Sequence, residues 1–117
     1  MPVIHDVVGA LGRREGVEAV VVLGNDGLPI ASRVGDGVDP EVLSAMVPNI
    51  VQASEQLAQH AGRGSLTAGV FEFSTGFVIL TTLSSDARLL ILARPATNLG
   101  PLLYDLARYR AEIAGLL

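Results

Sequence analysis

The chain lacks cysteine, tryptophan and lysine, and all eight of its basic residues are arginine. The absence of cysteine excludes disulfides, thiolate metal sites and thiol catalysis. The absence of lysine excludes the phosphate-binding loop GxxxxGK[ST], so the chain is not itself a GTPase of that kind.

Long apolar runs are also missing, because the longest, residues 19–23 and 89–93, contain five residues each. A membrane-spanning helix needs roughly 20. The first residues lack a basic start and include Asp6, which is unlike a signal peptide. We therefore expect no membrane span and a cytoplasmic location.

Positive charge is in short supply as well. The net charge is −4, whereas proteins that bind a phosphate backbone depend on clustered Lys and Arg. Nucleic acid is thus not an expected partner.

Aliphatic residues are abundant. Half of the 117 residues are apolar while only 4% are aromatic, so we expect a single domain over residues 1–117 with an aliphatic core. The mean hydropathy of +0.48 is high for a domain of this size, which predicts that some apolar surface meets another chain.

Hydrophobic periodicity predicts an α/β (α+β) chain of order α-β-β-α-β-β-β-α with a five-stranded antiparallel sheet. The turn at Asn25, Asp26 and Gly27 favours a hairpin, and Pro29 favours an edge position for the returning strand. The expected elements are a short helix ending near Gly12, strands at 17–23 and 28–32, a long helix from Asp39 to about Ala61, strands at 66–73, 77–83 and 88–94, and a helix after Asn98.

The expected helix ends carry suitable residue types. Asp39 before Pro40 is typical of an N-cap and a first helical residue, and glycines at 62 and 64 suit a C-cap and loop. Asn98 is the expected N-cap of the last helix. Pro48 falls inside the long helix and predicts a kink, at a cost of about 3 kcal/mol unless packing offsets it.

The long helix is apolar over about 180°, against the ~100° of a helix with one buried side. A sheet with three helices normally needs helices on both faces, so we expect this helix alone on one face and the terminal helices on the other. Its flanks are then covered by a second copy of itself or, as the alternative, by the other helices of its own chain. The stripe that faces the sheet consists of Leu43, Val47, Ile50, Ser54, Leu57 and Ala61.

The strand at 66–73 is a plausible edge with Glu72 as its single charge. Unprotected edges invite pairing, so two copies could join edge to edge. The alternative is that Thr67 and Glu72 keep the edge monomeric.

In order and spacing, three stretches resemble the roadblock and dynein light chain (Roadblock/LC7) family over essentially the whole chain. They are VVVLGNDGLPIAS at 20–32, SEQLAQHAGRGSL at 54–66 and FVILTTLSSDARLLILARPATNLGPLLYDL at 77–106, in which Asn98, Leu99 and Gly100 resemble the family's entry to the last helix. The resemblance implies a profilin-like sheet, homodimerisation through the third strand and the long helix, and binding or regulation of Ras-like small GTPases or scaffolding. It also implies that, where such a protein stimulates GTP hydrolysis, the catalytic groups are those of the GTPase itself. Pro48 departs from the pattern.

Catalytic and metal chemistry find little support. His5 and His60 have no HxxxH or HExxH companion, and no nucleophile motif surrounds any serine. Arg33 and Arg63 could serve as arginine fingers, although surface solvation is the simpler interpretation. The GRGS segment at 62–65 could hold an anion but reads more simply as a helix-terminating loop. We expect a non-enzyme without catalytic residues, cofactor, metal or small-molecule substrate.

We therefore predict a homodimeric regulator or scaffold that binds a Ras-like small GTPase. The alternatives are a ligand-sensing domain of the PAS or GAF kind, which an apo cavity beside the sheet would favour, and a scaffold without GTPase contact. The sequence does not name the partner or distinguish a homodimer from a heterodimer with a paralogue. The candidate interface consists of Val42, Met46, Asn49, Ile50, Ala53, Leu57, Leu66, Thr67 and Val70, and the candidate turns and caps are Gly27, Asp39, Gly64, Asn98 and Gly100.

Overall fold

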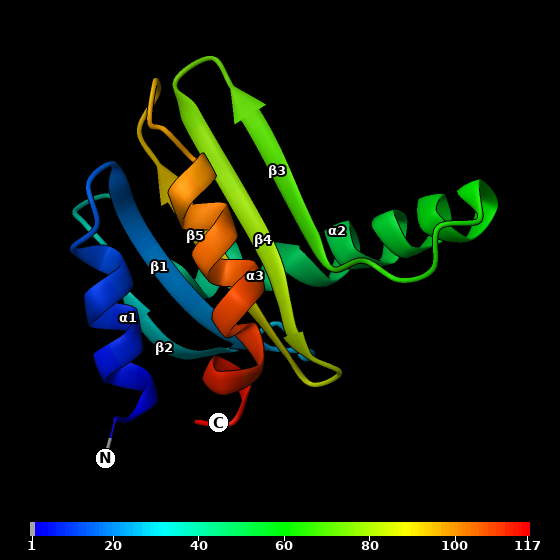
Figure 1. Ribbon diagram of the computed structural model, residues 1–117, viewed down its shortest axis with the longest axis horizontal. Coiled ribbons are helices and arrows are strands. Elements are labelled where there is room, and N and C mark those ends of the chain that lie inside the picture. Colours follow the sequence, from blue (N-terminus) through cyan, green and yellow to red (C-terminus); the bar gives the residue numbers. More distant parts are fainter. Residues whose placement is uncertain (1) are drawn as a thin grey trace.

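The computed structural model describes residues 2–117 and folds as one sheet with helices on both faces (Figure 1). The chain order α-β-β-α-β-β-β-α is the one predicted. The elements are α1 (Ile4–Gly12), β1 (Val17–Gly24), β2 (Pro29–Arg33), α2 (Pro40–Ala61), β3 (Ala68–Phe73), β4 (Gly76–Ser84), β5 (Ala87–Ala93) and α3 (Gly100–Ala114).

The five strands form an antiparallel sheet in the order β2-β1-β5-β4-β3. The last strand, β5, is central and pairs with both β1 and β4; Ile91 lies opposite Val20 on one side and Ile79 on the other. The edges are β2 and β3, as expected. Pro29 opens edge strand β2, where its missing N–H does not interrupt a central ladder.

Two hydrophobic cores lie on opposite faces of the sheet because neighbouring strand residues point to opposite sides. Val20 and Val22 face α1 and α3, whereas Val21 and Leu23 face α2. Burial on both faces explains the unbroken apolar run of β1. Figure 1 shows α1 and α3 in front of the sheet and α2 behind it, which confirms that the long helix occupies its face alone.

The ends of α2 are those expected. The Oδ1 atom of Asp39 accepts hydrogen bonds from the backbone N–H of Glu41 at 2.9 Å and of Val42 at 3.5 Å. Gly62 ends the helix in the left-handed conformation with φ of +64°, which glycine adopts without a Cβ penalty. The helix is continuous from Pro40 through Pro48 to Ala61.

Two predicted boundaries need correction. The N-cap of α3 is Leu99 and not Asn98, although Oδ1 of Asn98 still accepts the N–H of Gly100 at 3.3 Å. Strand β3 begins at Ala68, so Leu66 and Thr67 precede it. They nevertheless run beside β4, because their carbonyl oxygens accept hydrogen bonds from Thr82.

Across residues 2–117, no helix is both long enough and apolar enough to span a membrane.

Candidate protein-binding surface

An apolar groove of about 320 Å³ runs between α2 and the far half of the sheet. It exists because α2 covers only part of its face and leaves side chains of β3, β4 and β5 without a helix over them. Met46 on one wall is 57% exposed and Phe73 on the other is 58% exposed. The groove is lined by Leu43, Met46, Val47, Ile50, Phe71, Phe73, Val78, Leu90 and Leu92.

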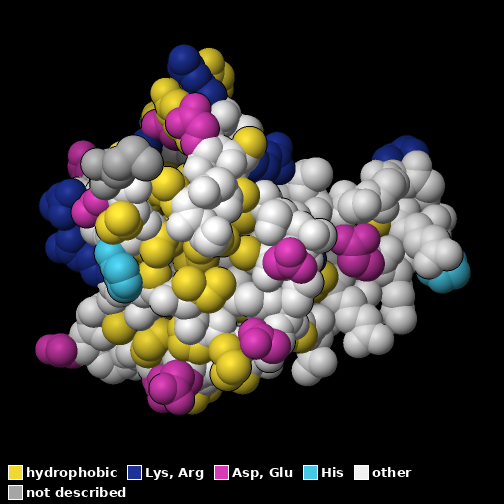
Figure 2. All heavy atoms as spheres, turned by 90° about the horizontal axis from the view of Figure 1, so that it is seen from below, with side chains coloured by type: hydrophobic (Ala, Val, Ile, Leu, Met, Phe, Trp, Pro, Cys, Tyr) yellow, Lys and Arg dark blue, Asp and Glu magenta, His cyan; other side chains and the backbone are white. Residues whose placement is uncertain are grey.

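The second half of α2 projects beyond the sheet (Figure 1). Figure 2, seen from below, shows this end standing apart from the body of the domain, over which apolar side chains gather. Leu57 in the projecting part is 71% exposed. The predicted sheet-facing stripe therefore holds only in the first half of α2, and its assignment of Leu57 and Ala61 to the sheet is wrong because no strand lies beneath them.

The groove gathers some of the predicted interface residues and excludes others. Met46 and Ile50 line it, and Val42, Asn49, Ala53 and Leu57 are exposed elsewhere along α2. Leu66 is partly buried and packs against the core beneath α2, whereas Thr67 is exposed.

Val70 is opposite Ile79, which packs in the core under α1 and α3. Val70 thus lies on the face of β3 away from α2, and its place in a partner interface stays a prediction.

The aromatic side of the groove was not expected from the sequence. Phe71 and Phe73 are two residues apart in β3, so both point to the α2 face, and their ring centroids are 6.5 Å apart. The available signal was that two of the three phenylalanines in the chain are at alternating positions of an edge strand.

Three of the candidate turn and cap residues lie in loops or at the start of a helix. Gly27 has φ of +78°, and Oδ1 of Asp26 accepts the N–H of Leu28 at 3.0 Å. Gly64 has φ of +78° in the loop after α2. Gly100 is the first residue of α3.

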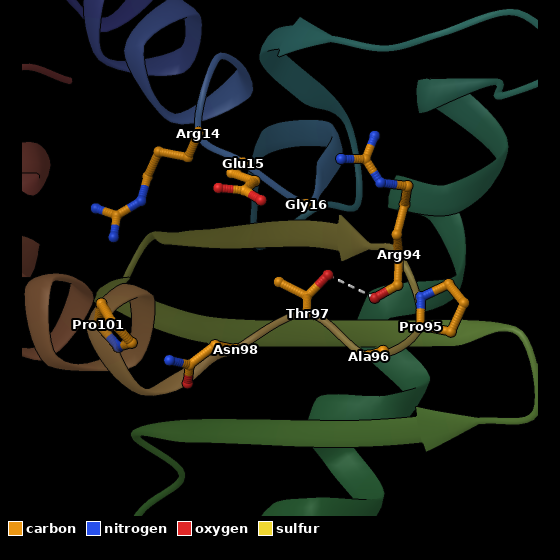
Figure 3. A pocket seen from close by; sticks show the side chains of 9 residues that line it. All are labelled: Arg14, Glu15, Gly16, Arg94, Pro95, Ala96, Thr97, Asn98 and Pro101. Atoms are coloured by element: carbon orange, nitrogen blue, oxygen red, sulfur yellow. Dashed lines mark hydrogen bonds between the residues drawn. The ribbon is translucent and has the colours of Figure 1, made fainter.

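A polar hollow of about 580 Å³ lies between the loop before β1 and the loop before α3 (Figure 3). Arg14 and Arg94 border it, and Figure 3 shows their guanidinium groups at separate places along its rim. Nη1 of Arg14 is 2.7 Å from Oδ2 of Asp105 on α3, and the hydroxyl of Thr97 donates to the carbonyl of Arg94 at 2.7 Å. The two cations do not converge on a common point, so the hollow is a poor phosphate cradle.

The other residues considered for chemistry lie apart from the groove. Arg33 donates to the carbonyl of Gly9 at 3.2 Å, and Arg63 lies beyond the far end of α2. No cluster of three metal-ligating side chains occurs in the part of the chain that the structure describes. A further apolar hollow of about 430 Å³ lies between α1 and α3 at the surface, away from α2.

The fold and the groove together define a small single-sheet α/β domain of the roadblock type. The chain belongs to the Roadblock/LC7 domain family, whose model matches residues 3–93. The uncharacterized protein MJ1340 of Methanocaldococcus jannaschii is 29% identical over 113 residues, which cover 97% of this chain and 98% of that protein.

Solved structures agree on the fold. MglB of Myxococcus xanthus superposes with a TM-score of 0.87 at 19% identity, covering 97% of this chain and 93% of that one. A structure described as MglB with tetrameric arrangement superposes with a TM-score of 0.85 at 15% identity, covering 97% and 86%. At these identities the similarity shows the fold alone.

Proposed function

We propose that two copies of this chain form a homodimer through the α2 groove and the β3 edge, and that the dimer binds a Ras-like small GTPase as a non-enzymatic regulator or scaffold. The observation that carries the proposal is the groove itself, whose walls expose more than half of Met46 and of Phe73 to water. Burying such surface against a second copy is favourable at roughly 25 cal/mol per Å² of apolar area.

The shape of α2 supports a second copy as the occupant. The helix projects past its own sheet and exposes Leu57, while the same sheet has a bare apolar half. An isologous contact would place the projecting end of each α2 over the bare half of the other sheet. The free edge of β3 carries Glu72 as its only charge, so edge pairing meets little repulsion.

One of the structurally similar proteins supports self-association, because an MglB structure is described as having a tetrameric arrangement. GTPase binding is supported by the family resemblance. A cytoplasmic location stays a prediction.

The ligand-sensing alternative gains little from the hollow between α1 and α3. That hollow and the α2 groove are both open at the surface, whereas the core residues of each helix layer, such as Val8 and Val47, are buried.

Light scattering coupled to size-exclusion chromatography tests the dimer. We expect a mass of twice 12.2 kDa, and we expect Met46→Glu to shift it toward the monomer because an unpaired charge would be buried. Tyr104→Glu on α3 is the matched control, since Tyr104 is 65% exposed on the opposite face. A monomeric mass for the unmodified chain when concentrated would overturn the dimer.

A separate experiment tests the GTPase. The chain is mixed with a candidate Ras-like GTPase loaded with GDP or with a GTP analogue, and both binding and turnover are measured. Binding that depends on the nucleotide supports regulation, whereas absent or nucleotide-independent binding leaves only the scaffold role. If the GTPase's own groups do the chemistry, Arg33→Ala and Arg63→Ala leave turnover unchanged.

A further inference from the structure

The apolar hollow between α1 and α3 lies on the face of the sheet opposite α2, and its volume is about 430 Å³. It exists because the two helices stand on different strands: α1 packs on β1 and β2, whereas α3 packs on β4. Figure 1 shows the helices running in opposite directions, with the start of α1 and the end of α3 at the same edge of the domain. This feature, the α1–α3 hollow, is therefore an open trough between two antiparallel helices.

Both walls of the α1–α3 hollow are apolar at helical spacing. They consist of Val7, Ala10 and Leu11 on α1 and of Leu106, Tyr109 and Ile113 on α3. The hollow extends along the first segment of the chain from Pro2 to Arg14, a length of about 18 Å, or roughly three helical turns.

The charged side chains of the lining leave one charge unbalanced. Arg14 and Asp105 join the two helices at one end of the hollow, with Nη1 of the arginine 2.7 Å from Oδ2 of the aspartate. Glu112 is exposed and makes no ion pair within residues 2–117. Arg108 is outside the lining, and its guanidinium carbon lies over the ring of Tyr109, 5.2 Å from the centroid. The lining thus carries one negative charge, that of Glu112.

The walls indicate which kind of occupant fits. Both walls are helices, whose backbone N–H and C=O groups are paired within each helix, so an extended segment would find no backbone partners here. A helix pairs its own backbone and presents an apolar stripe with the same three- and four-residue spacing. A small molecule would find little to orient it, because no buried side-chain polar atom of the described lining lacks a hydrogen bond.

The unbalanced charge indicates the polar chemistry of that helix. An acid at the rim favours a Lys or Arg of the partner, whose aliphatic stem would lie along Leu116 while its cation reaches Glu112. The same acid, in a chain with a net charge of −4, repels the anionic headgroups of a membrane surface. Charge and shape together therefore favour a basic amphipathic helix.

We propose that the α1–α3 hollow binds an amphipathic helix of a partner protein, about three turns long, with a basic residue beside Glu112. The proposal goes beyond the proposed function, because the homodimer uses the α2 groove and the β3 edge. One dimer then presents two such hollows on the opposite face of its sheets.

The test titrates the full ¹⁵N-labelled chain with three end-blocked peptides and follows the backbone amide signals by NMR. The first peptide has leucines in one helical stripe with lysines beside it, the second has glutamates in place of the lysines, and the third has the composition of the first with its leucines dispersed. We expect the first peptide to shift signals of α1 and α3 saturably and the second to bind about tenfold more weakly. The third should not bind. No response of α1 and α3 to the first peptide, or an equal response to the third, overturns the proposal.

A matched pair of alanine variants tests the position of the peptide. Ala10→Glu places a charge in the wall of the hollow and should weaken the first peptide about tenfold. Ala111→Glu is the control, because Ala111 is exposed on α3 and lies outside the lining. Both variants add the same charge to an exposed helical alanine, so equal effects would overturn the placement in the hollow.

A second matched pair tests the role of Glu112. Glu112→Lys should reverse the preference between the first and second peptides. Glu18→Lys makes the same change of net charge at an exposed position of β1 outside the lining, and it should leave the preference for the first peptide in place. If both variants reverse the preference, it follows the net charge and the proposed contact with Glu112 is wrong.

Two further measurements set the partner helix against other occupants. Binding of the chain to phosphatidylcholine vesicles that Ala10→Glu abolishes would assign the hollow to a membrane, and a mass above the dimer that Ala10→Glu prevents would assign it to a second copy. We expect neither, and either result overturns the proposal. The homodimer itself is tested by Met46→Glu, so this proposal and the proposed function can fail separately.

Discussion

A methyl group at Gly27 would lie 3.2 Å from Cγ of Pro48 and 3.2 Å from the carbonyl oxygen of Ser44. The β1–β2 turn is therefore packed directly against the middle of α2. Glycine is required here for two reasons: the backbone has a φ of +78°, and the helix approaches too closely for a side chain.

We predict that Gly27→Ala lowers the free energy of unfolding by about 1–3 kcal/mol, because backbone strain and a tight contact are added together. Gly37→Ala separates the two effects, since Gly37 has φ of +81° with open space around it. Urea unfolding of both variants makes the comparison. Equal losses would show that the contact with α2 contributes nothing.

Removing the cap of α2 should have a measurable and limited cost. Asp39→Ala loses the acceptor for the N–H groups of Glu41 and Val42, and we expect a loss of about 1 kcal/mol. Asp39→Asn keeps an acceptor oxygen and should retain most of the stability. Thermal unfolding monitored by circular dichroism ranks the variants, and a loss as large for asparagine as for alanine would contradict capping by this side chain.

Pro48 provides a prediction of opposite sign. A proline inside a helix removes the hydrogen bond to the carbonyl four residues earlier, that of Ser44, at a cost of about 3 kcal/mol or more. Pro48→Ala should raise the free energy of unfolding, by less than this amount because contact with the β1–β2 turn is lost. Pro40→Ala, at the first position of the helix, should change little. A destabilised Pro48→Ala would mean that the ring's packing outweighs the missing bond.

The ion pair between Arg14 and Asp105 should contribute little to stability. The side chains are 32% and 39% exposed, and solvent-exposed pairs typically couple by about 0.2–1 kcal/mol. A double-mutant cycle with alanine at both positions should give a coupling in that range, and added salt should reduce it. A larger, salt-independent coupling would show that the pair is desolvated more than its exposure indicates.

Local patterns were sufficient to predict the element order, the two covered faces and the capping of α2. Turn residues, alternation and helical periodicity each act within a few residues, so Gly27, Asp39 and Gly62 could be assigned from the sequence. Which face of the sheet a side chain of an edge strand points to is harder to predict, because a register shift of one residue exchanges the two faces. For this reason the sequence analysis did not show that Phe71 and Phe73 face α2.

Contacts between distant segments could not be predicted in this way. Arg14 and Asp105 are 91 positions apart, and only the packing of α1 beside α3 brings them together. The α1–α3 hollow likewise depends on helices from the two ends of the chain. The bare half of the sheet depends on where α2 crosses it, which no periodicity specifies.

The central position of β5 also governs how the chain can fold. The β1 segment contains three consecutive valines and pairs with β5 along most of its length. More than half of the sequence separates the two strands. During synthesis one edge of β1 therefore stays unpaired in the β1–β2 hairpin until β5 has been synthesised. Pairing with a strand so distant in the sequence is slow, and until it happens hydrophobic strands are exposed to other chains. Nascent chains that stall before Ala87 are therefore the ones most prone to aggregate.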